Sequence, residues 1–94
     1  MDITATRGVV VTRPEGLHAR PCTAIASTIR QFQSYVEVAA NGQKVDGRDV
    51  LQLLTMGVGQ GREVIFTAYG PDANEVLDAL SQLFENNFGI QESH

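Results

Sequence analysis

The spacing of apolar residues predicts two kinds of element in the first third of the chain. Residues 4–12 are rich in Val and Thr, whose branched side chains favour an extended strand. Residues 19–31, with Phe32 directly after them, carry apolar side chains three and four positions apart, which places them on one stripe of a helix. The other members of the stripe are Cys22, Ile25, Ala26 and Ile29. We therefore predict a strand followed by a helix.

The middle of the chain predicts a β-hairpin. Residues 34–40 are rich in Val and Ala and favour a second strand. Asn41 and Gly42 follow, and both residue types tolerate the positive φ that a tight two-residue turn requires. A short third strand at residues 43–46 is then expected to return antiparallel to the second.

The second half predicts two further helices and one strand. Residues 49–56 carry closely spaced apolar side chains and predict a short helix that Asp49 caps. Residues 63–69 predict the last strand. In the helix that follows, Asp72 and Glu75 match the pattern of a capping box at the start. The apolar face of this helix consists of Val76, Leu77, Leu80, Leu83 and Phe84.

The predicted order of elements is β-α-β-β-α-β-α. This order is typical of an α+β open-faced sandwich, in which three helices cover one face of a four-stranded antiparallel sheet. At 94 residues the chain suits one domain with a modest core, and we expect residues 1–94 to form that single domain.

Composition narrows the classes of partner and site. The formal net charge is −4 and the seven basic residues are scattered, so we expect no nucleic-acid or anionic-membrane partner. No apolar run approaches the roughly 20 residues that span a bilayer, and residues 1–6 lack the pattern of a secretory signal. One Cys and two His disfavour an internal disulfide and a zinc site. We expect a soluble, cytoplasmic protein without metal and without membrane insertion.

The segment from Gly16 to Pro21, with the sequence GLHARP, carries the candidate chemistry. Proline lacks an N–H and has a fixed φ, so Pro21 suits the first turn of a helix, and Gly16 allows the chain to bend before it. We expect free backbone N–H groups, the His18 imidazole and the Arg20 guanidinium to converge there, a combination that favours a phosphoryl group. An uncharged imidazole nitrogen is a good nucleophile near neutral pH, and the positive end of a helix favours that uncharged form.

This hexapeptide resembles the signature around the active histidine of the HPr family, the small phosphocarriers of the phosphoenolpyruvate-dependent phosphotransferase system. The resemblance covers nearly the whole chain, because the length, the order of elements and the Asn41-Gly42 hairpin agree as well. Residues 50–54 and the Gly-rich residues 57–61 resemble the middle helix and following loop of the family. The resemblance implies an HPr-like open-faced sandwich.

The resemblance also implies a carrier rather than an enzyme with its own turnover. His18 matches the histidine that accepts a phosphoryl group, through Nδ1 in the family, from phosphorylated Enzyme I and passes it to an Enzyme II A domain in sugar uptake. Arg20 matches the arginine that assists transfer, and the backbone N–H groups of Ala19 and Arg20 are expected to contact the phosphate. No cofactor is implied, and a monomer is expected.

Two alternative functions share this fold. Residues 83–89 somewhat resemble the ends of nitrogen-type HPr paralogues, whose phosphorylation state controls regulatory partner proteins. A degenerate paralogue, in turn, binds partners without phosphoryl chemistry. The presence of both His18 and Arg20 disfavours this second alternative.

Several of these features also have a purely structural explanation. Taken alone, His18 is typical of a residue whose ring caps a helix, and Arg20 of a solvated surface residue. We interpret Cys22 as a small core residue, with a reactive thiolate at the helix start as the alternative. Residues 57–61 lack the Lys-Ser/Thr ending of a nucleotide-binding loop and are interpreted as a flexible connection. His94 is expected to have no role.

The short middle helix has two interpretations. Val50, Leu51 and Leu54 either belong to the core or form an apolar docking rim for partner proteins near the histidine, as the matching positions do in the family. Transient docking of this kind suits a carrier that must release its partners quickly. Ala19 and Arg30 are expected to border the same surface.

Asp49 stands where many HPr proteins have a serine that a regulatory kinase phosphorylates. Aspartate has no hydroxyl group, so we expect that regulation to be absent at this position. Asp caps a helix about as well as Ser, which is the structural explanation. The functional alternative is a permanent negative charge near the docking rim, which predicts that Asp49→Ser is phosphorylated faster by Enzyme I.

Overall fold

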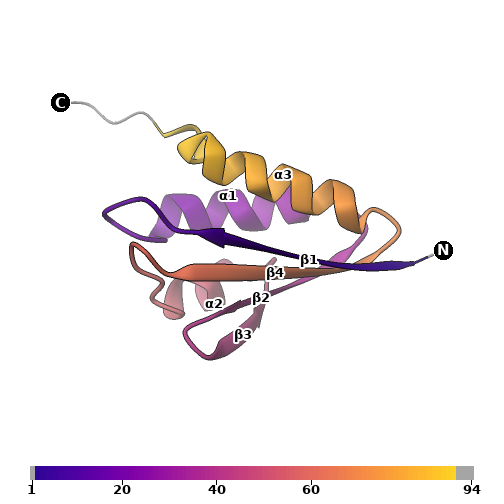
Figure 1. The fold of residues 1–94 in the computed structure, drawn as a ribbon, viewed down its shortest axis with the longest axis horizontal. Coiled ribbons are helices and arrows are strands. Elements are labelled where there is room, and N and C mark those ends of the chain that lie inside the picture. The colour runs from indigo at the N-terminus through magenta and orange to yellow at the C-terminus, as the bar shows by residue number, and fades with distance from the viewer. Residues whose placement is uncertain (1, 91–94) are drawn as a thin grey trace.

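The computed structural model describes residues 2–90 and contains the predicted elements in the predicted order (Figure 1). The strands are β1 (Ile3–Val10), β2 (Tyr35–Ala40), β3 (Gln43–Asp46) and β4 (Glu63–Gly70). The helices are α1 (Ala19–Ile29), α2 (Val50–Thr55) and α3 (Ala73–Glu85), and a short 3-10 turn, η1 (Asn87–Gly89), follows α3. The order β-α-β-β-α-β-α is thereby confirmed.

The four strands form one antiparallel sheet in the order β1-β4-β2-β3. Thr67 of β4 pairs with Thr6 of β1 on one side and with Glu37 of β2 on the other. The predicted hairpin joins β2 and β3, and Asn41 and Gly42 both adopt the left-handed backbone, with φ of 51° and 74°. The α+β class with an antiparallel sheet is confirmed.

The alternation of buried and exposed residues along the strands shows which face of the sheet the helices cover. Every second residue of β4 from Val64 to Gly70 is buried, and those between are half-buried or exposed. Val36 and Val38 of β2 are in register with two of these residues and are also buried. The opposite face is open, and Tyr35 and Tyr69 are exposed on it with their ring centroids 6.0 Å apart.

The three helices contribute to a single hydrophobic core with the covered face of the sheet. α1 and α3 lie side by side over the sheet, whereas α2 packs against α1 and β3 (Figure 1). The buried apolar residues of α1 are Pro21, Cys22, Ile25, Ala26 and Ile29, that of α2 is Leu53, and those of α3 are Ala73, Val76, Leu77 and Leu80. Burial of this apolar surface is the main force that holds the helices over the sheet.

The first strand and the first helix end earlier than the sequence predicts. β1 ends at Val10 rather than at residue 12, because its partner β4 begins at Glu63 and Val10 is the residue that pairs there. α1 ends at Ile29 rather than at residue 31, and Arg30 serves as its C-cap by donating its N–H to the Ala26 carbonyl. Both differences lie at element ends, where tertiary partners decide the boundary.

The predicted capping box at the start of α3 is wrong. The Asp72 carboxylate makes no capping bond to α3. It accepts instead from the backbone N–H groups of Gln33 and Ser34, each at 2.9 Å, and from the Ser34 hydroxyl at 2.5 Å. These bonds, led by the Ser34 hydroxyl, lower the pKa of the Asp72 carboxyl from its usual value. The carboxylate therefore joins the start of α3 to the segment before β2.

Candidate functional site

His18 reaches the start of α1 through a tight turn braced by the loop before β4. Gly16 has φ of 70°, and a Cβ there would overlap the Val58 carbonyl oxygen. The same carbonyl accepts the N–H of Leu17 at 2.9 Å, and the Leu17 and Val58 side chains are both buried. The glycine-rich residues 57–61, which the sequence predicts to be only a flexible connection, thus help to position His18.

The backbone at the start of α1 leaves two amide groups open. His18 is the N-cap residue, and its ring makes no capping bond, so the structural alternative of a capping histidine is wrong. The His18 carbonyl accepts the N–H of Cys22 at 3.1 Å, and Pro21 has no N–H. Within residues 2–90, the amides of Ala19 and Arg20 have no backbone partner. Such amides at the positive end of a helix form an anion site.

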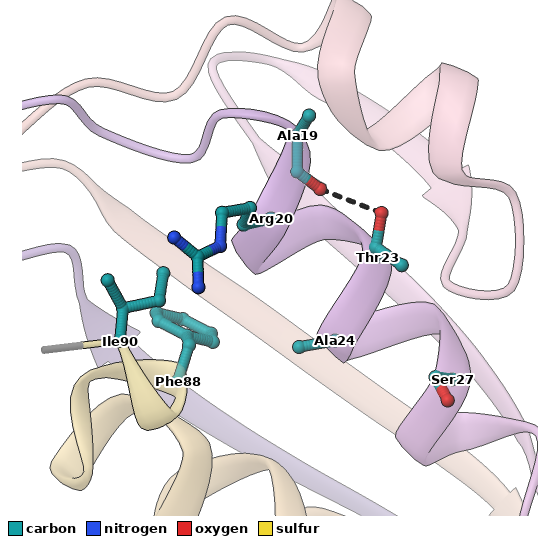
Figure 2. Close-up of a pocket in the computed structure, with 7 residues that line it drawn as sticks. All are labelled: Ala19, Arg20, Thr23, Ala24, Ser27, Phe88 and Ile90. Atoms are coloured by element: carbon teal, nitrogen blue, oxygen red, sulfur yellow. Dashed lines mark hydrogen bonds between the residues drawn. The ribbon is translucent and has the colours of Figure 1, made fainter.

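Arg20 is exposed and lines an open groove between α1 and η1 (Figure 2). The groove has a volume of about 420 Å³ and is also lined by Ala19, Thr23, Ala24, Ser27, Phe88 and Ile90. Figure 2 shows the Arg20 guanidinium directed toward Phe88 and Ile90. The role of Arg20 in contacting a phosphoryl group stays a prediction.

A different arginine, Arg13, contacts the imidazole. Its guanidinium donates from Nη2 to Nε2 of His18 at 3.4 Å, and the Arg13 side chain is only 6% exposed. Glu15 accepts from the same Nη2 at 3.3 Å, and Asn87 of η1 accepts from Nη1 at 2.5 Å. Sequence reasoning missed Arg13, because an arginine in a polar loop gives no sign that the fold buries it beside the histidine.

Cys22 is a core residue, as predicted. Its side chain is fully buried, and the thiol donates to the Leu17 carbonyl at 3.6 Å. Burial raises the pKa of the Cys22 thiol to about 11. The alternative of a reactive thiolate is therefore wrong, although the residue lies in the first turn of a helix.

The three residues of the predicted docking rim differ in exposure. Leu51 is 70% exposed, whereas Val50 and Leu54 are half-buried and pack against the core. The core position that faces inward is Leu53. A six-residue helix on the surface thus leaves Leu51 in solvent and its two neighbours at the edge of the core. The docking role of this rim stays a prediction.

Asp49 caps α2, as predicted. Its carboxylate accepts the N–H of Gln52 at 3.1 Å. Arg30, which the sequence places at the border of the docking surface, is exposed and donates to the Arg48 carbonyl next to Asp49 at 2.8 Å. His94 lies outside the described residues.

No helix among residues 2–90 is both long enough and apolar enough to cross a membrane. The same part of the chain contains no group of three or more His, Cys, Asp or Glu side chains arranged to hold a metal ion.

Residues 5–86 match the family model described as the PTS HPr component phosphorylation site. The phosphocarrier protein HPr of Cupriavidus necator is 32% identical over 83 residues, covering 88% of this chain and 93% of that protein. The multiphosphoryl transfer protein of Salmonella typhimurium is 36% identical over 83 residues, 85% of this chain. The match spans only 22% of that longer protein.

The fold is also similar to a solved structure. The crystal structure of HPr-C-His from Thermoanaerobacter tengcongensis has a TM-score of 0.86 and 31% sequence identity. The superposition covers 94% of this chain and 99% of that one.

Proposed function

The chain belongs to the HPr family of phosphocarriers of the phosphotransferase system, and from that premise we propose that His18 carries a phosphoryl group. His18 accepts the group from phosphorylated Enzyme I and passes it to an Enzyme II A domain. The protein acts in the cytoplasm as a carrier in sugar uptake, without a substrate turnover of its own. The alternative is a nitrogen-type regulatory function. The Enzyme II A domains that accept the phosphoryl group from His18 distinguish the two functions.

One observation carries this proposal: among residues 2–90, the His18 imidazole at the start of α1 lies beside two backbone amide groups that have no backbone partner. Among residues 2–90, His18 is the sole histidine, it is half-buried, and its ring does not close the helix. The N–H groups of Ala19 and Arg20 stabilise the negative charge of the phosphoryl group once it is attached. The exposed Arg20 guanidinium adds a positive charge in the first turn of the same helix.

The docking rim supplies the surface for partner proteins. Leu51 offers an exposed apolar side chain, and Val50 and Leu54 extend it toward the core. We expect Ala19, which is exposed in the first turn of α1, to border the same docking surface. An apolar patch this small favours weak, rapidly reversible complexes, as successive transfer to two partners requires.

Labelling from phosphoenolpyruvate tests the proposal. The protein is incubated with Enzyme I and phosphoenolpyruvate that carries a labelled phosphorus atom. We expect wild type and His94→Ala to take up one label each, and His18→Ala to take up none. The labelled protein is then offered separate Enzyme II A domains of the sugar and nitrogen types.

Transfer to a sugar-type domain supports the function in uptake, and transfer only to a nitrogen-type domain supports the regulatory alternative. Label on His18→Ala, or no label on folded wild type, contradicts the proposed site.

A further inference from the structure

Asn41 lies at the tip of the β2-β3 hairpin, but its side chain reaches the segment that follows α2. We propose that Asn41 is a positioning residue: it holds the end of α2 and thereby fixes the docking rim in place relative to His18. This inference rests on the proposed function, because it concerns the surface on which Enzyme I docks. It adds a residue of the hairpin to the elements that build the site.

The Asn41 side chain bonds two consecutive carbonyl groups. Its Nδ2 donates to the Met56 carbonyl at 3.0 Å and to the Gly57 carbonyl at 3.3 Å. Both carbonyls directly follow α2, which ends at Thr55. Carbonyl groups at the end of a helix lack partners within the helix, so Asn41 supplies one from outside. The end of α2 is therefore tied to the hairpin.

The hairpin turn itself does not require this amide. The turn requires a residue that tolerates positive φ, as Asn41 does with φ of 51°, and Asn, Asp and Gly all meet that requirement. Of the three, only Asn has a side chain that can donate, because an ionised Asp only accepts and Gly has no side chain. The Asn41 amide thus makes a contact that goes beyond the chemistry of the turn.

α2 is too short to hold its position without contacts at its ends. It has six residues, and Leu53 is its buried side chain. An isolated helix of this length is unstable in water. Arg30 donates to the Arg48 carbonyl at 2.8 Å shortly before α2 begins, and Asn41 holds the opposite end. Side chains from outside α2 therefore fix the helix that carries the docking rim.

The segment that Asn41 holds continues to the turn that presents His18. Val58 follows Gly57 directly, and its side chain is buried. Its carbonyl accepts the N–H of Leu17, the residue before His18, at 2.9 Å. Residues 56–58 thus connect the docking rim, the hairpin and the turn of His18. A partner that contacts the rim and His18 at the same time binds best when these parts are already in place.

Substitutions at the hairpin tip test this role. Asn41→Gly keeps a residue that tolerates positive φ and removes the side chain. Asn41→Asp keeps the shape but replaces the donating amide with a carboxylate. Gln43→Glu is the matched control, because it adds the same negative charge at an exposed position of β3 and leaves the Asn41 amide intact.

Three measurements follow on the folded proteins. Initial rates of phosphorylation by Enzyme I, over a range of concentrations of the carrier, give KM and kcat separately. Phosphoramidate phosphorylates the same proteins without a partner protein. Hydrogen exchange followed by NMR reports the local stability at the end of α2 through the amides of Met56 and Gly57, which bond Gln52 and Leu54.

We expect both Asn41 variants to exchange the amides of Met56 and Gly57 about tenfold faster, as the loss of two neutral hydrogen bonds allows. The KM for Enzyme I should rise about threefold, because a rim that is only partly in place lowers the apparent affinity. The kcat and the rate with phosphoramidate should stay near wild type, since neither depends on docking. Gln43→Glu should match wild type in all three measurements.

A merely stabilising role of Asn41 would lower the free energy of unfolding and leave the KM of the folded variants unchanged. A wild-type KM, or wild-type exchange at Met56 and Gly57, in the folded Asn41 variants therefore overturns the positioning role and leaves the proposed function intact. A rise in KM that occurs in Asn41→Asp and Gln43→Glu but not in Asn41→Gly reports the added charge and also overturns it. A wild type that Enzyme I does not phosphorylate at His18 overturns the proposed function and this inference with it.

Discussion

The starts of α1 and α2 treat their free amide groups in opposite ways. At α2 the Asp49 carboxylate accepts the N–H of Gln52, so the helix start is closed by its own chain. At α1 the residue in the same position is His18, whose ring does not cap, and no acidic residue occurs in the first turn. The amides of Ala19 and Arg20 are therefore available to an external anion.

The difference teaches that the open helix start has a cost that the rest of the fold offsets. An N-cap side chain contributes about 1 kcal/mol to helix stability, and α1 lacks that contribution. α1 compensates with its longer apolar stripe, which buries five residues, whereas α2 buries only Leu53. A helix that is well packed along its length can leave its first turn open for phosphoryl chemistry.

The largest expected effect is that of Gly16→Ala, which disturbs the turn that presents His18. The substituted residue would keep the backbone φ of +70°, and its new methyl group would overlap the Val58 carbonyl oxygen. We expect the free energy of unfolding to fall by about 3 kcal/mol in urea denaturation, the sum of backbone strain and overpacking. Gly42→Ala is the matched control, because Gly42 has φ of +74° but open space around it. It should lose only about 1 kcal/mol, and equal losses would contradict the role of the Val58 contact.

Asp72→Asn extends the comparison to the start of α3. There the Asp72 carboxylate does not cap its own helix and accepts from Gln33 and Ser34 instead. We expect a loss of about 1.5 kcal/mol in the free energy of unfolding at neutral pH, because an amide nitrogen would face one of these donors. Since the folded pKa of Asp72 is lowered, wild type loses this advantage as the pH falls through that pKa, below the usual value of 3.8.

Urea denaturation of both proteins across this pH range measures the difference. It should be full above pH 3.8 and shrink below it. A difference that stays constant across the range would show that the charge of Asp72 is not responsible.

Ala19→Asp adds a carboxylate to the first turn of α1, one residue after its N-cap, where wild type has no acidic residue. A carboxylate in the first turn competes with the phosphoryl group for the positive end of the helix. We expect phosphorylation by Enzyme I to slow about tenfold, and the free energy of unfolding to rise by about 0.5 kcal/mol. Ala19→Asn has the same shape without the charge and should retain most of the rate. A rate as low in Ala19→Asn would point to lost docking contacts instead.

Asp49→Ala opens the start of α2 instead. The N–H of Gln52 loses its partner, and we expect the free energy of unfolding to fall by about 1 kcal/mol. Urea denaturation measures the loss, and Asp49→Asn should recover most of it because Asn is also a good N-cap. No loss in Asp49→Ala would mean that water replaces the cap at no cost.

The smallest effect is expected for Asp49→Ser, which separates capping from charge. Serine caps about as well as aspartate, so the free energy of unfolding should change by less than about 0.5 kcal/mol. If the negative charge of Asp49 hinders docking, Enzyme I phosphorylates the variant faster, by about threefold. Initial rates of labelling measure this effect. Equal rates would leave capping as the whole role of Asp49.

Predictions from the sequence succeeded where a few neighbouring residues decide the structure. The Asn41-Gly42 turn, the α1 stripe and the Asp49 cap each depend on residues close together in the chain. The hexapeptide that begins at Gly16 likewise indicated a helix start with a histidine before it. One prediction failed where a local pattern met distant competitors, because the Asp72 carboxylate bonds Gln33 and Ser34 instead of capping α3.

The sequence by itself determined the order of the elements, the apolar stripes that face the core and the position of His18 at the start of a helix. It could do so because local spacing and turn chemistry act over a few residues. Only the tertiary structure decided which groups meet there. Arg13 bonds Asn87, 74 residues away, and Asp72 bonds Ser34, 38 residues away. Contacts of that range form only when the core brings the helices onto the sheet, since the burial of apolar surface, rather than the polar groups themselves, drives the approach.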